Sequence, residues 1–281
     1  MANCTHDCST CSGSCSSRSK SSFVKPLHKK SSVKKVIAVA SGKGGVGKSL
    51  VTSLLAVRAA ARGYRVALLD ADITGPSLPK AFGVHALAGG KDGEIHPVLT
   101  KSGMQLISMN CLLEHEDDPV VWRGSLIAGA AVQFWTDVVW KDVDIMFIDM
   151  PPGTGDVPLS VFQSIPLSGI VVVTTPQDLV EMIVGKAVKM AKLMNVPILG
   201  LAENMSYFEC PDCGKKHELF GASKVEGLAK KFGVPAFARL PVSPALAGLA
   251  DSGRIEEATT DELSDIFQEI ERARSIKDYT V

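Results

Sequence analysis

The segment GKGGVGKS, from Gly42 to Ser49, has the residue types and spacing of a phosphate-binding loop. It fits the pattern G-x4-G-K-[ST] and directly follows an apolar run that is typical of a strand. Backbone N–H groups of such a loop can surround a β-phosphate, while Lys48 neutralises its charge and Ser49 holds Mg²⁺. The pattern predicts a nucleotide site made of Gly42, Lys43, Gly44, Gly45, Val46, Gly47, Lys48, Ser49 and Leu50.

Two carboxylates stand at the ends of other apolar runs. Asp149 follows DIMFI, at the position of an aspartate that holds a Mg²⁺-bound water. Asp72 lies in LLDADITGPSLP and is expected to orient the attacking water. The Gly153 amide, in DMPPGTGD, is expected to donate to the γ-phosphate. Together with the loop, these residues predict hydrolysis of a nucleotide, with Lys48, Asp72 and Asp149 as catalytic residues.

Four of the seven cysteines lie within the first fifteen residues. Their spacing is C-x3-C-x2-C-x3-C, and the last three match the end of a ferredoxin-type run. The surrounding Ser, Thr, Gly, Asn and Asp offer too little apolar surface to order the segment by themselves. An iron–sulfur cluster, a zinc site, two disulfides and an unstructured redox-active tail all stay open for Cys4, Cys8, Cys11 and Cys15.

A second pair, Cys210 and Cys213, has C-x2-C spacing. One chain then supplies only two thiolates, which is half of a zinc knuckle with His217 as a possible third ligand. Two chains related by a two-fold axis would supply four thiolates, enough for one 4Fe-4S cluster. Cys111 is interpreted as a small buried hydrophobic residue.

Charge and hydropathy exclude several classes of protein. The chain has 30 basic and 30 acidic residues and a formal net charge of zero, which argues against a nucleic-acid-binding protein. It contains neither an apolar stretch of membrane-spanning length nor a secretory signal, so we expect a cytoplasmic protein without a membrane partner. Cytosolic thiols are kept reduced, which favours metal ligation over disulfides.

The arrangement of apolar runs predicts how these residues are positioned. Short runs over 35–41, 65–72, 104–110, 143–151, 169–176, 196–204 and 234–241 alternate with helical patterns over 49–63, 180–195, 225–233 and 261–274. This alternation predicts an α/β fold with a doubly wound, mostly parallel sheet and ligands at the carboxyl ends of its strands. We predict a flexible, Cys-rich basic tail over 1–32, an ATPase domain over 33–281 and a surface insertion over 85–97.

The motifs SGKGGVGKS, DADITGPSLP, WRG, DMPPGTGD, TTPQDL and ENMSYFECPDCG, in this order, resemble those of the Mrp/Nbp family of P-loop ATPases. These are cytosolic iron–sulfur cluster carriers related to MinD and to the nitrogenase iron protein. The resemblance implies a homodimer in which Lys43 reaches the partner's ATP, with Asp72 in the first switch and 149–156 in the second. It also implies nucleotide contacts from Asn204 and Pro241, and a 4Fe-4S cluster bridged by Cys210 and Cys213.

The resemblance implies a carrier that receives clusters from donors and passes them to apo-proteins. Two positions depart from the family pattern. Leu50 replaces a common Thr, which leaves Ser49 as the only hydroxyl for Mg²⁺ at that turn, and Ser125 replaces the proline expected after WRG. The tail spacing also departs from the wider spacing of the eukaryotic extension. A positioning ATPase of the MinD/ParA type and a reductase similar to the nitrogenase iron protein stay open as alternative functions.

Overall fold

The computed structural model describes residues 24–73, 75, 77–91, 94–113, 124–153, 155–177 and 180–279. Its central element is a nine-stranded sheet with the order β10-β9-β8-β1-β7-β2-β6-β5, in which β11 pairs with β9. The strands are β1 (Val33–Ser41), β2 (Val66–Asp70), β5 (Val98–Leu99), β6 (Gln105–Ile107), β7 (Val143–Asp149), β8 (Gly169–Thr174), β9 (Ile198–Glu209), β10 (Lys216–His217) and β11 (Phe237–Pro241).

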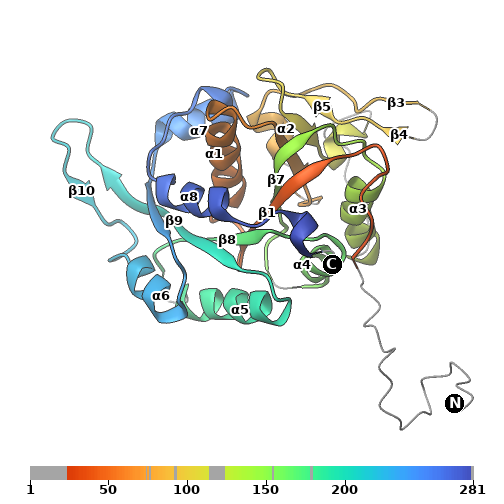
Figure 1. The fold of residues 1–281 in the computed structure, drawn as a ribbon. Helices are drawn as coiled ribbons and strands as arrows, with labels where there is room; N and C mark the ends of the chain where they lie inside the picture. Colours follow the sequence, from red (N-terminus) through yellow and green to blue (C-terminus); the bar gives the residue numbers. More distant parts are fainter. Residues whose placement is uncertain are drawn as a thin grey trace, which may run out of the picture.

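Helices cover both faces of this sheet, as Figure 1 shows. The helices are α1 (Lys48–Ala61), α2 (Leu78–Ala81), α3 (Gly124–Thr136), α4 (Asp156–Ser164), α5 (Val180–Leu193), α6 (Val225–Phe232), α7 (Pro244–Asp251) and α8 (Ser264–Arg272). α1, α2, α7 and α8 lie over one face, and α3 to α6 lie over the other (Figure 1). The central strands β1, β2, β7 and β8 are buried on both faces, which is why their sequences are largely continuous apolar runs without alternation.

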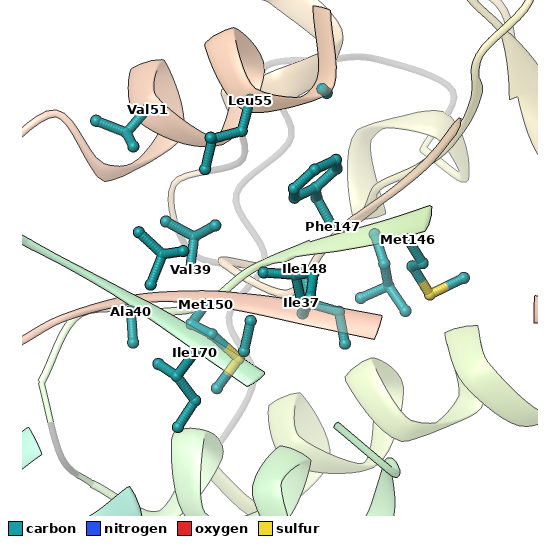
Figure 2. Close-up of a cluster of buried hydrophobic side chains, with 14 of the residues drawn as sticks. Ile37, Val39, Ala40, Val51, Leu55, Met146, Phe147, Ile148, Met150 and Ile170 are labelled. Carbon is teal, nitrogen blue, oxygen red and sulfur yellow. The ribbon is translucent and has the colours of Figure 1, made fainter. Parts of the chain in front are cut away.

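Part of the hydrophobic core lies between β1, β7 and α1. Figure 2 shows Val51 and Leu55 of α1 above Val39 of β1, with Ile148 of the neighbouring β7 beside them. These four side chains have an exposed fraction of 0%. Burial of each contributes about 1.5–3 kcal/mol, so the strand that leads into the phosphate loop is held firmly against the helix that follows it.

Parallel pairing brings the candidate catalytic residues to one edge. β1 pairs in parallel with β7 and β8, and β2 pairs in parallel with β7, with Asp70 opposite Asp149. β8 and β11 both pair in parallel with β9. The carboxyl ends of these strands therefore lie at the same edge of the sheet, here named the carboxyl edge, as the doubly wound fold predicts.

The structure confirms the predicted fold class and adds elements that the sequence did not reveal. The strand predicted over 196–204 continues to Glu209 and forms an antiparallel hairpin with β10. The insertion over 85–97 contains the short pair β3 (Gly90–Lys91) and β4 (Glu94–Ile95). α2, α3, α4 and α7 were not predicted. The exposed positions of α3 include Leu126 and Gly129, so the helix lacks the polar face that reveals a period of 3.6 residues.

Residues 24–32 lie against the domain, although the sequence analysis placed them in the tail. The backbone N–H of Lys25 donates to the Ser164 carbonyl at 2.8 Å, and the Trp135 indole N–H donates to the Lys25 carbonyl at 3.0 Å. Ser31 Oγ donates to the Val138 carbonyl at 3.1 Å. Packing therefore begins before residue 33, while the division of the chain into tail and domain stays a prediction.

Candidate functional site

The phosphate loop connects the end of β1 to the start of α1. Gly47 precedes the helix with φ of +79°, a backbone conformation that residues other than glycine adopt only with strain. A Cβ at this position would lie 2.1 Å from Nδ2 of Asn204. No side chain of the described residues caps the start of α1. The first N–H groups of the helix therefore remain available to an anion such as a phosphate.

Lys48 and Ser49 converge on Asp149. Lys48 Nζ lies 2.7 Å from Asp149 Oδ1, and Ser49 Oγ donates to Asp149 Oδ2. Thr52 Oγ1, one turn further along α1, donates to Asp149 Oδ1 at 2.9 Å. Asp149 is fully buried and Lys48 is 6% exposed. The carboxylate, the hydroxyl and the ammonium group predicted from the sequence are thus brought within hydrogen-bond distance of one another.

Asp72 and Asp70 complete this cluster from β2. Asp72 Oδ2 lies 3.6 Å from Lys48 Nζ. Asp70 is fully buried and accepts hydrogen bonds from the Asp72 N–H and from Ser108 Oγ. Burial raises the pKa of the Asp70 carboxyl, the negative charge of Asp149 raises it further, and Lys48 opposes both effects. Several carboxyl groups therefore share one buried cation.

Asp70 and Thr52 are site residues that the sequence analysis missed. Asp70 is the first aspartate of LLDAD, two positions before Asp72. Only Ala71 separates Asp70 from Asp72, and two aspartates so close together at the end of a predicted strand could have indicated Asp70 as a site residue. Thr52 had no such signal, because a hydroxyl inside an apolar helix most often bonds its own backbone. Its Oγ1 lies 3.0 Å from the Lys48 carbonyl oxygen and 2.9 Å from Asp149 Oδ1, so both acceptors share its one proton.

Lys43 and Gly153 have partners within this chain. Lys43 Nζ donates to Oε1 of Gln177, a residue of the TTPQDL motif. The Gly153 N–H donates to the Ser41 carbonyl at 2.8 Å. The roles predicted for them, toward the partner's ATP and the γ-phosphate respectively, stay predictions. Leu50 is partly buried and packs against the hydrophobic core.

Asn204 connects β9 to the phosphate loop. Its Nδ2 donates to the Val46 carbonyl at 3.0 Å, and the residue is 3% exposed. Pro241 ends β11 and lies opposite Tyr207 of β9. The amide predicted to contact adenine is therefore also a structural support of the loop, and the nucleotide contacts of Asn204 and Pro241 stay predictions.

Cys210 and Cys213 lie at the turn between β9 and β10. The Cys210 N–H donates to the Lys215 carbonyl at 3.0 Å, and the Gly214 N–H donates to the Cys210 carbonyl at 2.8 Å. Backbone N–H groups of Cys213 and Asp212 lower the pKa of the Cys210 thiol. Cys213 is exposed and Cys210 is half-buried, and Figure 1 shows the hairpin extending from the body of the domain. The turn thus presents two thiols, and its backbone lowers the pKa of the Cys210 thiol.

The other cysteines divide into two cases. Cys111 is 1% exposed and belongs to the hydrophobic core, which confirms its interpretation as a small buried residue. Cys4, Cys8, Cys11 and Cys15 lie outside the described residues. Within the described part of the chain, no three His, Cys, Asp or Glu side chains come together as a metal site, so His217 does not complete a site with the hairpin thiols. None of the described helices is long and apolar enough to cross a membrane.

Comparison with known proteins connects this geometry to named relatives. The iron-sulfur cluster carrier protein of Clostridium perfringens is 47% identical over 233 residues, which cover 80% of this chain and 82% of that protein. The iron-sulfur cluster carrier protein of Methanocaldococcus jannaschii is 42% identical over 262 residues, which cover 90% of each chain.

Solved structures show the same similarity. The nucleotide-binding protein of Archaeoglobus fulgidus, solved with ADP, superposes with a TM-score of 0.75 at 43% identity, covering 82% of this chain and 91% of that one. The cell division ATPase MinD of Pyrococcus furiosus has a TM-score of 0.58 at 20% identity, covering 85% of this chain and 98% of that one, and it shows the fold alone. A family model described as NUBPL iron-transfer P-loop NTPase, of the ParA group, matches residues 32–274, and the chain therefore belongs to that family.

Proposed function

We propose that this chain binds and hydrolyses ATP and, as a cytoplasmic homodimer, assembles a 4Fe-4S cluster that it transfers to apo-proteins. Membership of a P-loop NTPase family implies nucleotide hydrolysis. The observation that carries the proposal is that Asn204 of β9 contacts the phosphate loop, and the same strand leads directly to the turn that holds Cys210 and the exposed Cys213. Relatives named as iron-sulfur cluster carriers support the same cargo.

The residues around Lys48 fit a magnesium nucleotide. Ser49 Oγ and the Asp149 carboxylate are hard oxygen groups of the kind that Mg²⁺ prefers, and they lie beside the start of α1. Ser49 would hold the ion directly and Asp149 would hold one of its waters, as in other P-loop proteins. The bound ion would neutralise charge that develops on the phosphates. Lys48 would bind phosphate oxygens, and Asp72, whose side chain is 15% exposed, would accept a hydrogen bond from the attacking water.

The cluster is the cargo of the proposed reaction. Cys210 and Cys213 supply two thiolates, so a four-iron cluster with four thiolate ligands requires a second chain. The backbone N–H groups that lower the pKa of Cys210 would also stabilise its thiolate, which is the form that binds iron. Cys4, Cys8, Cys11 and Cys15 would supply a second set within one tail, suited to receive a cluster from a donor or to pass it onward.

Transfer to an acceptor tests the proposal directly. After anaerobic reconstitution with iron and sulfide, the protein is mixed with an apo-ferredoxin and separated from it. We expect iron and sulfide to appear in the ferredoxin, measured by metal analysis and by its absorption spectrum. A chelator added before the acceptor distinguishes direct transfer from release into solution. Iron that stays on this protein and only changes its oxidation state would contradict a carrier and indicate a reductase.

Lys43 is expected to act on the ATP of the partner subunit. We expect Lys43→Ala to lower hydrolysis by orders of magnitude, because it removes a charge that stabilises the transition state. Equal amounts of Lys43→Ala and Asp72→Ala chains, each inactive alone, should regain about a quarter of wild-type turnover when subunits exchange at random, since half of the dimers then hold one complete site. Phosphate release measures this, with Lys189→Ala on α5 as a control that keeps full activity. A mixture that stays inactive after exchange would place Lys43 in its own subunit.

A further inference from the structure

β9 has an irregularity between its contact with the phosphate loop and its cysteines. Met205 has φ of +56°, in the left-handed region that costs a residue other than glycine about 1 kcal/mol or more. Glu203 lies opposite Arg239 and Tyr207 lies opposite Pro241, so four steps along β9 correspond to two along β11. This is a β-bulge, and bulges of this kind bend a strand and re-aim the residues that follow it. The bulge therefore sets the direction in which β9 carries Cys210.

A buried carboxylate lies beside the bulge. Glu203 is fully buried, and its Oε1 accepts a hydrogen bond from Ser206 Oγ at 2.7 Å. Its Oε2 has no hydrogen-bond partner among the described residues. Arg239 Nε lies 4.0 Å from Oε1. A half-satisfied buried carboxylate responds strongly to small shifts of the cation beside it, because the interior screens charge weakly.

Arg239 joins this carboxylate to the hairpin. Its Nε donates to Ser206 Oγ at 2.7 Å, and its Nη2 lies 2.7 Å from Oε1 of Glu218, which follows β10. The guanidinium carbon also lies 5.7 Å from the centroid of the Tyr207 ring. One side chain on β11 thus holds the bulge with one nitrogen and the returning arm of the hairpin with another. The hairpin of β9 and β10 extends from the body of the domain in Figure 1.

We propose that Arg239 is a positioning residue that transmits the nucleotide state of the phosphate loop to the Cys210–Cys213 turn. The route starts at Val46, whose carbonyl accepts from Asn204, and continues through Glu203 and the bulge. Nucleotide binding displaces the loop, the bulge shifts with Asn204, and Arg239 carries the shift to Glu218 and the hairpin. The proposal rests on the proposed function, since it assigns regulation to the same thiol pair.

The geometry requires arginine at this position. The planar guanidinium offers several N–H donors in fixed directions, so one group contacts Ser206 and Glu218 at once. A lysine ammonium carries its three donors on one nitrogen, so it does not reproduce the two separate nitrogens with which Arg239 contacts Ser206 and Glu218. Arg239→Lys is therefore expected to retain folding and charge while it loses most of the coupling.

The reactivity of the thiols tests this route without iron. Full-length metal-free protein with Cys4, Cys8, Cys11 and Cys15 changed to Ser is alkylated with iodoacetamide, with and without adenylyl imidodiphosphate and Mg²⁺. Because Cys111 is buried, the measured alkylation comes from Cys210 and Cys213. In the protein that retains Arg239, we expect nucleotide to change their alkylation rate roughly fivefold or more. A roughly fivefold change is at the lower end of typical coupling between two sites. Arg239→Ala and Arg239→Lys should reduce this to less than about twofold while nucleotide affinity is unchanged.

Two further variants complete the experiment. Glu218→Gln removes the charge at the hairpin end of the bridge, at a side chain that is 41% exposed, and should also reduce the nucleotide effect even where Arg239→Ala does not fold. Arg254→Ala removes an arginine of similar two-point geometry, bound to Glu257 in a remote 3₁₀ helix, and should keep the full effect. Two results would overturn the proposal. One is an alkylation rate that nucleotide does not change in the protein that retains Arg239, and the other is a full nucleotide effect in Arg239→Ala or Glu218→Gln. Loss of the carrier function would instead appear as absent iron transfer with this coupling intact.

Discussion

Lys48→Ala is expected to abolish nucleotide binding and to lower hydrolysis by about a hundredfold to a thousandfold or more. The ammonium group lies 2.7 Å from Asp149 and 3.6 Å from Asp72, beside the N–H groups of the phosphate loop. Its removal leaves carboxylates facing the phosphates without a compensating charge. Isothermal titration with ATP and phosphate release measure the two effects. Wild-type hydrolysis in Lys48→Ala would refute the assignment of this loop.

The same substitution should lower the free energy of unfolding by about 3–5 kcal/mol, because it leaves buried carboxylates without their cation. Asp70 already has a raised pKa, and loss of Lys48 removes the positive charge that opposes this rise, so the pKa of Asp70 increases further. A folded-state pKa above that of the unfolded chain gives stability that is present at low pH and is lost as pH rises through the folded value. Denaturation by urea should therefore show a larger defect at pH 8 than at pH 5.

A second substitution separates the two effects of Lys48. Asp149→Asn combined with Lys48→Ala removes one buried charge and should restore most of the stability without restoring hydrolysis. Asp149→Asn alone keeps Lys48 and the phosphate loop, so nucleotide binding should persist while Mg²⁺-dependent hydrolysis falls. A double variant as unstable as Lys48→Ala alone would show that the stability defect has another origin than unpaired charge.

Cys210→Ala with Cys213→Ala is expected to remove the bridging cluster and the dimer stability that depends on it. If both cysteine sets hold 4Fe-4S clusters, a reconstituted dimer carries about 12 irons and the double variant about 8. Deletion of residues 1–20 should instead leave about 4 irons per dimer. Only the double variant should lose cluster-linked dimerisation, because a cluster that binds the dimer alone stabilises it by mass action.

Iron analysis and sedimentation velocity measure both variants. Cys111→Ala is the matched control, since that cysteine lies in the core and should leave the iron content unchanged. Zinc instead of iron at the hairpin after anaerobic purification would contradict the carrier function. Iron that persists at Cys210 and Cys213 in monomers would also contradict it, since a single chain would then complete the site.

The sequence alone determined the fold class and the nucleotide loop. Continuous apolar runs such as DIMFI identify strands buried on both faces, and GKGGVGKS identifies the loop after the first of them. These signals are local, because a backbone conformation that cradles phosphate requires glycines at fixed positions in one segment. The carboxylate positions Asp72 and Asp149 also followed, since parallel strands end at the same edge.

Only the tertiary structure decided which groups meet across strands. Asp70 became a site residue because β2 lies beside β7 and places it opposite Asp149, at a burial that the sequence does not reveal. The strand predicted to end at Asn204 continues to Glu209, because β11 and β10 supply its hydrogen-bond partners from later in the chain. Arg239 reaches Ser206 and Glu218 for the same reason. Such contacts depend on strand order and register, which long-range packing sets and local residue patterns do not encode.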